Sequence, residues 1–150
     1  MHPNQDSEAL LNDVGAAFSR LRRRTSQSLT GPGMTKRDLT RNLIINVVDE
    51  AAGEITVGAV ADQLNVDPSV ASRMVSDCID AGYLQRAASA ADGRRTVLTL
   101  TPEGIALRDR FRQLQRKAFE QITSAWPDAE RLEFARLLVK YADASGRHAP

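Results

Sequence analysis

The chain has 150 residues, of which 42% are hydrophobic and 26% charged, and its formal net charge is only +1. This length allows one domain with an apolar core, and the small net charge means that any affinity for nucleic acid must come from how the charges are distributed. No apolar run approaches the roughly 18 residues of a membrane span, and the polar, acidic N-terminus does not resemble a secretion signal. We therefore expect a soluble, cytoplasmic protein without a membrane partner.

The residue types that serve catalysis are scarce. Cys78 is the only cysteine, and the two histidines, His2 and His148, lie at opposite ends of the chain. The sequence has no Cys/His metal cluster, no Gly-rich phosphate loop and no Ser/His/Asp or Cys/His set. We expect neither an enzyme nor a bound metal or cofactor.

Basic residues are gathered in three places, and arginine outnumbers lysine 17 to 3, which suggests a bacterial source with GC-rich DNA. One group lies near residue 20, one around residue 90 and one on a segment after residue 107. In order, they are Arg20, Arg22, Arg23 and Arg24; Arg86, Arg94 and Arg95; and Arg108, Arg110, Arg112, Arg116 and Lys117.

Two amphipathic helices are predicted in the first third of the chain. Over residues 7–24, apolar side chains recur at steps of three and four, and TSQSLTGPGMT then indicates a loop. From Lys36 to about Ala52 the apolar stripe is wider, which is typical of a buried central helix. Gly53 is expected to end this helix.

Residues 54–84 predict two short helices joined by a tight turn. Thr56 is a candidate N-cap for the first helix, and Asn65 to Asp67 form the connection. We expect the Asp67 side chain to accept from the first free amides of the second helix, with Pro68 in its first turn. Gly82 should end this helix, so the pair forms a helix-turn-helix.

A β-hairpin and two helices complete the chain. Strands are predicted over residues 83–87 and 96–101, with Leu98 and Leu100 on one face and a long tip between the strands. Thr101-Pro102-Glu103 indicates the start of a helix over residues 102–124, and Pro127 opens a last helix that reaches about residue 143. SGRHAP at the C-terminus is expected to be disordered.

Four segments resemble the MarR (multiple antibiotic resistance regulator) family of winged-helix transcription factors. They are the helix-turn-helix VGAVADQLNVDPSVASRMV with its Ser72-Arg73 pair, the helix exit AGYLQR, the Asp92-Gly93-Arg94 tip that matches the family's D-x-R motif, and LTPEG before the long helix. The resemblance implies a mainly α fold with a small β-hairpin, forming one domain over residues 1–150. It further implies a winged helix-turn-helix lobe over residues 36–101 and dimerisation helices over 7–24 and 102–143.

By the same resemblance the protein is a sequence-specific transcriptional regulator, most simply a repressor. It would bind double-stranded DNA as a homodimer on a pseudo-palindromic operator. Many members release DNA when a small aromatic molecule enters a cleft, for which the candidate residues here are Phe18, Arg22, Leu43, Val47 and Phe111. Packing in a core or a dimer is a simpler explanation of each.

The arginines at the hairpin tip have a specific use if the tip is a DNA-binding wing. Arg94 would enter the minor groove and Arg95 would reach a phosphate, while Asp92 would orient the guanidinium or fix the turn and Gly93 would allow a sharp tip. The alternative is an ordinary Asp-Gly turn with solvated arginines, and the upstream helix-turn-helix favours the wing.

The second helix of the helix-turn-helix would lie in the major groove. Its polar positions are Ser69, Ser72, Arg73 and Ser76, and candidate phosphate contacts near the central helix are Thr35, Lys36, Arg37 and Arg41. Arg73 is alternatively a solvated or ion-paired residue, and the other charges alternatively form a wet face. Asp77 and Asp80 are unfavourable for phosphate contact and leave a winged-helix protein-interaction module as a second interpretation.

Cys78 lies four residues after Met74 on the packing face of the same helix. We interpret it as a small buried hydrophobe, because a reactive thiol needs exposure and nearby positive charge. A redox-responsive regulator acting through Cys78 is the alternative.

Overall fold

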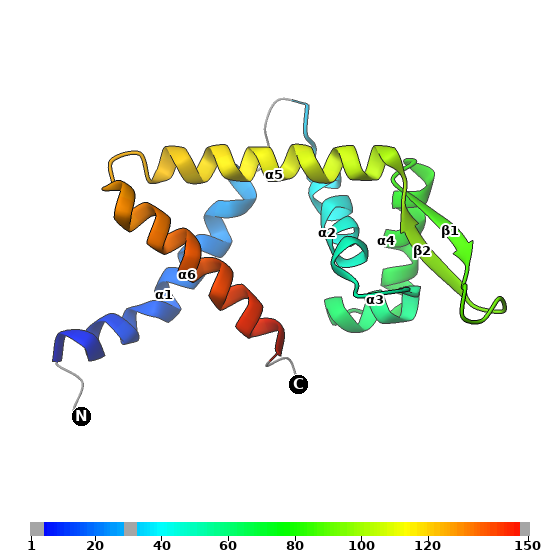
Figure 1. The fold of residues 1–150 in the computed structure, drawn as a ribbon, viewed down its shortest axis with the longest axis horizontal. Helices are drawn as coiled ribbons and strands as arrows, with labels where there is room; N and C mark the ends of the chain where they lie inside the picture. The colour runs from blue at the N-terminus through cyan, green and yellow to red at the C-terminus, as the bar shows by residue number, and fades with distance from the viewer. Residues whose placement is uncertain (1–4, 29–32, 148–150) are drawn as a thin grey trace. The chain divides into compact units, whose positions relative to one another are not determined.

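The computed structural model describes residues 5–28 and 33–147. Its elements are α1 (Gln5–Ser28), α2 (Lys36–Glu50), α3 (Val57–Leu64), α4 (Pro68–Asp80), β1 (Leu84–Ala88), β2 (Thr96–Leu100), α5 (Pro102–Ile122) and α6 (Asp128–Arg147) (Figure 1). Their contacts form two compact units, one up to Gln115 and one from Arg116. The mainly α fold with one β-hairpin confirms the predicted fold class. Across the described ranges, no helix combines the length and apolarity that crossing a membrane requires.

Helix α2 begins at a capping box. The Thr35 hydroxyl accepts from the Asp38 amide at 3.1 Å, and the Asp38 carboxylate accepts from the Thr35 amide at 2.9 Å, so two amides at the helix start are satisfied. Burial opposes the charge on Asp38, but the bonds from Thr35 and then Arg41 outweigh it and lower the pKa of this carboxyl. The helix ends at Glu50, with Ala51 as an extended C-cap, so the prediction that Gly53 ends it was wrong.

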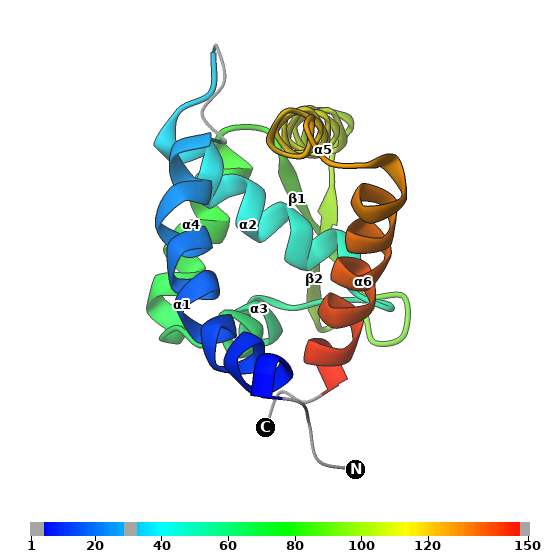
Figure 2. The same ribbon diagram turned by 90° about the vertical axis from the view of Figure 1, so that its left-hand side faces the viewer.

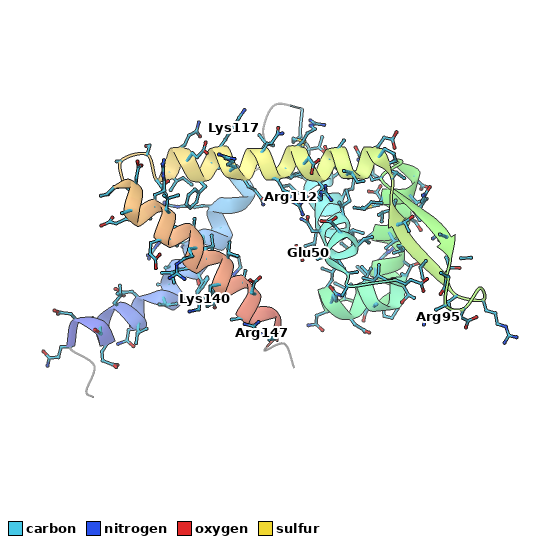
Figure 3. All side chains as sticks on the ribbon, in the orientation of Figure 1. Glu50, Arg95, Arg112, Lys117, Lys140 and Arg147 are labelled. Atoms are coloured by element: carbon cyan, nitrogen blue, oxygen red, sulfur yellow. The ribbon has the colours of Figure 1, made fainter. Side chains whose placement is uncertain are left out.

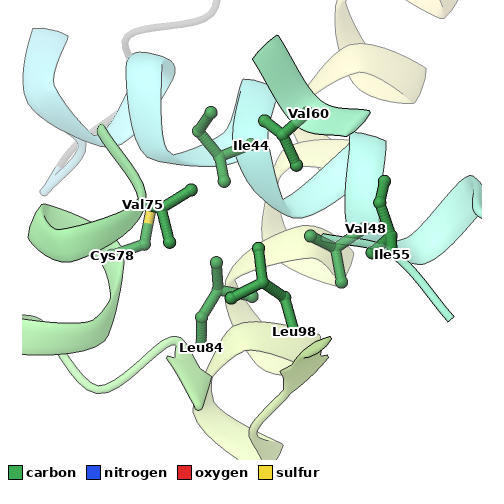
Figure 4. Packing of buried hydrophobic residues seen from close by; sticks show 8 residues of the cluster. All are labelled: Ile44, Val48, Ile55, Val60, Val75, Cys78, Leu84 and Leu98. Carbon is green, nitrogen blue, oxygen red and sulfur yellow. The ribbon is translucent and has the colours of Figure 1, made fainter. Parts of the chain in front are cut away.

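Two apolar clusters pack on α2. The first contains Ile44, Val48, Ile55, Val60, Val75, Cys78, Leu84 and Leu98, and it joins α2 to the helix-turn-helix and the hairpin (Figure 4). The second contains Met34, Ile45, Leu107 and Phe111, and it joins α2 to α5. Each fully buried large side chain stabilises the fold by about 1.5–3 kcal/mol relative to exposure. The prediction of a buried central helix is thus confirmed.

Helices α3 and α4 form the predicted helix-turn-helix against α2 (Figure 1 and Figure 2). Thr56 caps α3 as predicted, accepting from the Ala59 amide at 3.2 Å. The turn passes through Asn65 in the left-handed conformation, which asparagine adopts more readily than most residues. Asp67 occupies the N-cap of α4 before Pro68, but its side chain makes no capping bond. That part of the prediction was wrong, and it is the Asp67 carbonyl that accepts from the Val70 and Ala71 amides.

The hairpin follows directly from the end of α4. Gly82 has φ +84°, the left-handed conformation expected of a glycine that terminates a helix. The two strands pair antiparallel in a register that sets Leu84 opposite Leu100 and Ala88 opposite Thr96. The Leu98 amide also donates to the Ile55 carbonyl at 2.9 Å, which holds the segment before α3 beside β2. The hairpin is therefore fixed to the lobe along both strands.

The start of α5 is fixed to the junction between α4 and β1. The Thr101 hydroxyl accepts from the Gly104 amide and donates to the Gly82 carbonyl. A Cβ at position 104 would lie 2.1 Å from the Tyr83 carbonyl oxygen, so only glycine fits this approach. The LTPEG segment thus encodes a close contact between two backbone segments.

The outer helices carry apolar side chains that the single chain leaves exposed. Helix α1 is longer than the predicted 7–24 and has Leu10 at 70% and Leu11 at 64% exposure. In the second unit, Phe134 of α6 stacks on Phe119 with ring centroids 5.9 Å apart, yet α6 has no buried residue. Ser145, Gly146 and Arg147 belong to this helix, so the prediction of a disordered SGRHAP was wrong for these three, and His148 onward lies outside the described residues.

Candidate nucleic-acid interface

Helix α4 has one buried face and one open polar face. Ala71, Val75 and Cys78 are fully buried against the lobe core. The opposite face borders a shallow hollow of about 580 Å³, lined by Arg37, Ser69, Ser72, Arg73, Ser76, Asp77 and Asp80. The four residues predicted to face DNA from this helix therefore share one surface with Arg37 from α2. Hydroxyls and guanidinium groups of this kind can donate to base edges and to phosphates.

Asp77 connects α4 to α2 through two arginines, a contact that the sequence did not reveal. Its carboxylate accepts from Arg41 Nε at 2.8 Å and from the Arg37 guanidinium. Arg41 also donates to Asp38 at 3.2 Å and lies 5.7 Å from the centroid of the Tyr83 ring. Hydrogen bonds from Arg41 and Arg37 lower the pKa of Asp77, so the carboxylate stays charged throughout the neutral range.

The four predicted phosphate contacts differ in availability. Thr35 is occupied in the capping box, and Arg41 is occupied by Asp77 and Asp38 with only 17% of its side chain exposed. Lys36 and Arg37 lie on the surface at the start of α2. Phosphate contact by each of the four remains a prediction, and Arg37 is the one that also borders the hollow.

The tip of the hairpin presents two arginines to solvent. Both Arg94 and Arg95 are exposed, and Arg95 lies in the loop that joins the two strands (Figure 3). Asp92 fixes the turn, because its carboxylate accepts from the Arg94 amide at 3.1 Å and its carbonyl accepts from the Arg95 amide at 2.9 Å. Gly93 does not have a positive φ, and a Cβ there would meet nothing within 4 Å. The shape of the tip therefore does not depend on glycine at this position.

A polar cluster at the base of the wing was also missed by sequence reasoning. Glu54, just before α3, accepts from the Ser89 hydroxyl at 2.5 Å and from the Ala90 amide at 2.6 Å. Ser89 is buried, and its hydroxyl accepts in turn from the Ala91 and Asp92 amides. The bonds from Ser89 and then Ala90 lower the pKa of Glu54. This carboxylate thus anchors the loop that carries Arg94.

The predicted cleft residues do not form a single lining in the structure. Phe111 is 1% exposed in the cluster between α2 and α5, whereas Val47 packs on the other cluster. Leu43 is 47% exposed, Arg22 is exposed and Phe18 is half-buried. Phe111 is therefore a core residue, and an effector cleft remains a prediction.

The structure supports the interpretation of Cys78 as a core residue. Its side chain is fully buried, and burial, reinforced by the neighbouring Asp77 carboxylate, raises the pKa of the thiol to about 12. Within the described residues there is no group of three His, Cys, Asp or Glu side chains that could hold a metal ion. His2 and His148 lie outside these residues.

Comparison with known protein families gives a match for the lobe that contains the candidate interface. Residues 31–95, which span α2 to the wing tip, match the MarR family. Over these residues, which make up less than half of the chain, the sequence is similar to the MarR family. MarR-family regulators are non-enzymatic DNA-binding proteins, in agreement with the expectation that this chain is not an enzyme.

Solved structures share this fold over nearly the whole chain. A putative transcriptional regulator from Pseudomonas aeruginosa has a TM-score of 0.74 at 14% identity, with 99% of this chain and 100% of that chain covered. A MarR family protein from Bacillus stearothermophilus has a TM-score of 0.72 at 17% identity, with coverages of 97% and 99%. The Streptomyces coelicolor regulator PcaV, solved with its natural ligand, has a TM-score of 0.58 at 21% identity, with coverages of 97% and 99%. No curated protein matched the sequence significantly.

Proposed function

We propose that this MarR-family protein is a sequence-specific repressor that binds double-stranded DNA as a homodimer. The observation that carries the proposal is a contrast among the arginines. Arg41 and Arg108 are ion-paired inside the lobe, whereas in the described part of the chain Arg73 and Arg94 have exposed guanidinium groups without an acidic partner within 4.0 Å. These two arginines occupy α4 and the wing tip, the two elements that a winged helix inserts into DNA.

In this proposal each element has a distinct task on the duplex. Helix α4 enters the major groove, where Arg73 and the hydroxyls of Ser69, Ser72 and Ser76 contact base edges or phosphates. Arg94 enters the adjacent minor groove, whose negative potential attracts a guanidinium, and Arg95 contacts a phosphate. Two lobes in a homodimer then span two half-sites about one helical turn apart, so the operator is pseudo-palindromic.

The exposed apolar side chains of α1 and α6 support the homodimer. Helix α6 has Leu132 at 64% and Val139 at 62% exposure, and no residue of it is buried in the single chain. A helix with such a surface is normally covered by a partner. A dimer bound over a promoter would block access to that promoter, so repression is the simplest outcome.

A small aromatic effector is the least supported component of the proposal. The related PcaV structure contains its natural ligand, and Staphylococcus aureus MepR, at 18% identity, was solved with ethidium bromide. A ligand would release DNA here only by favouring a lobe spacing that does not match two successive major grooves. Phe18, Arg22, Leu43, Val47 and Phe111 remain the candidate residues.

The proposal is tested by titrating the wild type and Arg94→Ala against the intergenic DNA upstream of the protein's own gene, using fluorescence anisotropy at two salt concentrations. We expect tight, salt-sensitive binding that Arg94→Ala weakens about tenfold or more, because the minor-groove contact is lost. If the wild type bound this DNA no better than random duplex, selection of bound fragments from the whole genome would follow. Failure to enrich any sequence would contradict the proposal and favour a protein-interaction module.

A further inference from the structure

Asp77 holds two arginines that differ in how firmly they are fixed. Arg41 has 17% of its side chain exposed and is held by Asp77, Asp38 and the face of the Tyr83 ring. Arg37 has 71% of its side chain exposed, and among the described residues Asp77 is its one ion-pair partner. An exposed pair of this kind adds little to stability, so thermal motion and competing anions open it readily.

The exposed pair lies on the surface that faces DNA in the proposed complex. Arg37 and Asp77 both line the hollow beside Ser69, Ser72 and Arg73. A phosphate brought to this hollow would be within reach of the long Arg37 side chain, and it carries the same charge as the carboxylate that now holds that side chain. The two anions therefore compete for one guanidinium.

We propose that Asp77 is a specificity-determining residue, which engages Arg37 in the unbound protein and yields it to a DNA phosphate only when α4 is seated in the groove. This inference rests on the proposed DNA-binding function and deepens it. Loosely placed duplex gains little from Arg37, because the carboxylate already satisfies it. Affinity for random DNA is thereby reduced, while a fully docked complex recovers the contact. The near-neutral net charge of the chain also keeps non-specific attraction to DNA low.

The test is a double-mutant cycle measured on a duplex of random sequence about three helical turns long. Asp77→Asn releases Arg37 while keeping an oxygen that can accept from Arg41, so we expect random-duplex affinity to rise about two- to fivefold. In the Arg37→Gln background the same substitution should give no more than the change caused by losing one negative charge near DNA. Asp80→Asn measures that change, because Asp80 lines the same hollow without an ion pair in the described chain.

Two results would overturn the inference: an unchanged affinity of Asp77→Asn, or an equal gain with and without Arg37. Circular dichroism and thermal melting check that Asp77→Asn folds. Should it not fold, the salt dependence of operator binding by the wild type and by Arg37→Gln decides, because only a seated α4 gives Arg37 a phosphate contact. A wild-type slope steeper by about one phosphate contact per protomer supports the exchange, and equal slopes contradict it. Because random duplex is the probe, failure of this cycle leaves operator binding by Arg94 untouched, whereas loss of all binding would contradict the proposed function itself.

Discussion

At the scale of single residues, burial decides what each functional group of the lobe can do. Cys78 and Asp77 are neighbours on α4, but the thiol is fully buried in the core while the carboxylate reaches two arginines on α2. The same helical turn thus contains one inert group and one charged group. The helical spacing of apolar residues predicts that Cys78 is buried. The ion pairs of Asp77, in contrast, depend on residues about 40 positions away.

The buried thiol predicts slow chemistry at Cys78. A rise of its pKa from 9.0 to about 12 lowers the thiolate population at neutral pH about a thousandfold, and burial blocks access as well. We expect iodoacetamide to label native protein at least about a hundredfold more slowly than urea-unfolded protein. Because the folded pKa is raised, the contribution of this thiol to stability is complete below pH 9.0 and declines as the pH rises towards 12.

Mass spectrometry of timed aliquots measures the labelling rate, and Cys78→Val provides the control. This variant keeps an apolar side chain of similar size, so DNA binding should be unchanged under reducing and oxidising conditions. Equal labelling of native and unfolded protein, or a loss of redox response in Cys78→Val, would instead support the redox-responsive alternative.

At the scale of elements, the wing depends on the segment before α3. The Glu54 carboxylate accepts hydrogen bonds from the Ser89 hydroxyl and the Ala90 amide. The Ser89 hydroxyl in turn accepts from the amides that lead into the Asp92 turn. A loop of this length would otherwise sample many conformations, and each would place Arg94 differently. The cluster therefore fixes the position of the loop that carries Arg94.

Removing the Glu54 carboxylate should weaken DNA binding through Arg94. We expect Glu54→Ala to lower affinity for the operator, and Arg94→Ala to cost much less in that background than in the wild type. Fluorescence anisotropy of the four proteins measures the coupling, and Glu54→Gln, which keeps one accepting oxygen, should retain part of the affinity. Gly93→Ala is the matched control, since neither φ nor space at the tip demands glycine. Additive losses from Glu54→Ala and Arg94→Ala would rule out this positioning role.

At the scale of the whole molecule, the outer helices leave apolar side chains exposed in the single chain. Helix α6 has the spacing of a packed helix, with Leu132 and Leu138 on one stripe, but these are 64% and 46% exposed. The second half of α5 behaves similarly, with Ile122 at 70% exposure. Association of two chains is the expected way to bury them.

A charge placed on α6 should separate the proposed homodimer. We expect Leu132→Glu to convert a dimeric wild type into monomer at micromolar concentration, because burying a carboxylate among apolar side chains is unfavourable by several kcal/mol. Sedimentation velocity measures the mass, and Leu43→Glu, an equally drastic change at a 47% exposed position of α2, outside the predicted dimerisation helices, should leave it unaltered. A wild type that sediments as a monomer would contradict the homodimer.

The sequence was informative where local chemistry determines structure. The cap at Thr56, the helix end at Gly82 and the two strands of the hairpin follow from patterns within a few residues, and they appear as predicted or within a few positions. Contacts between distant segments were missed, including Glu54 with Ser89 and Asp77 with Arg37. Charged side chains carry no periodic signal, so only the folded lobe shows which of them meet.

The two apolar clusters on α2 have a mechanical consequence. Ile44 and Ile45 are consecutive and fully buried, yet Ile44 packs towards α4 and the hairpin while Ile45 packs towards Phe111 of α5. Helix α2 cannot rotate or slide to relieve one cluster without opening the other, because close-packed interiors resist small displacements. A disturbance beside Phe111 would therefore be transmitted through the width of a single helix to α4, the helix that faces DNA in the proposed complex.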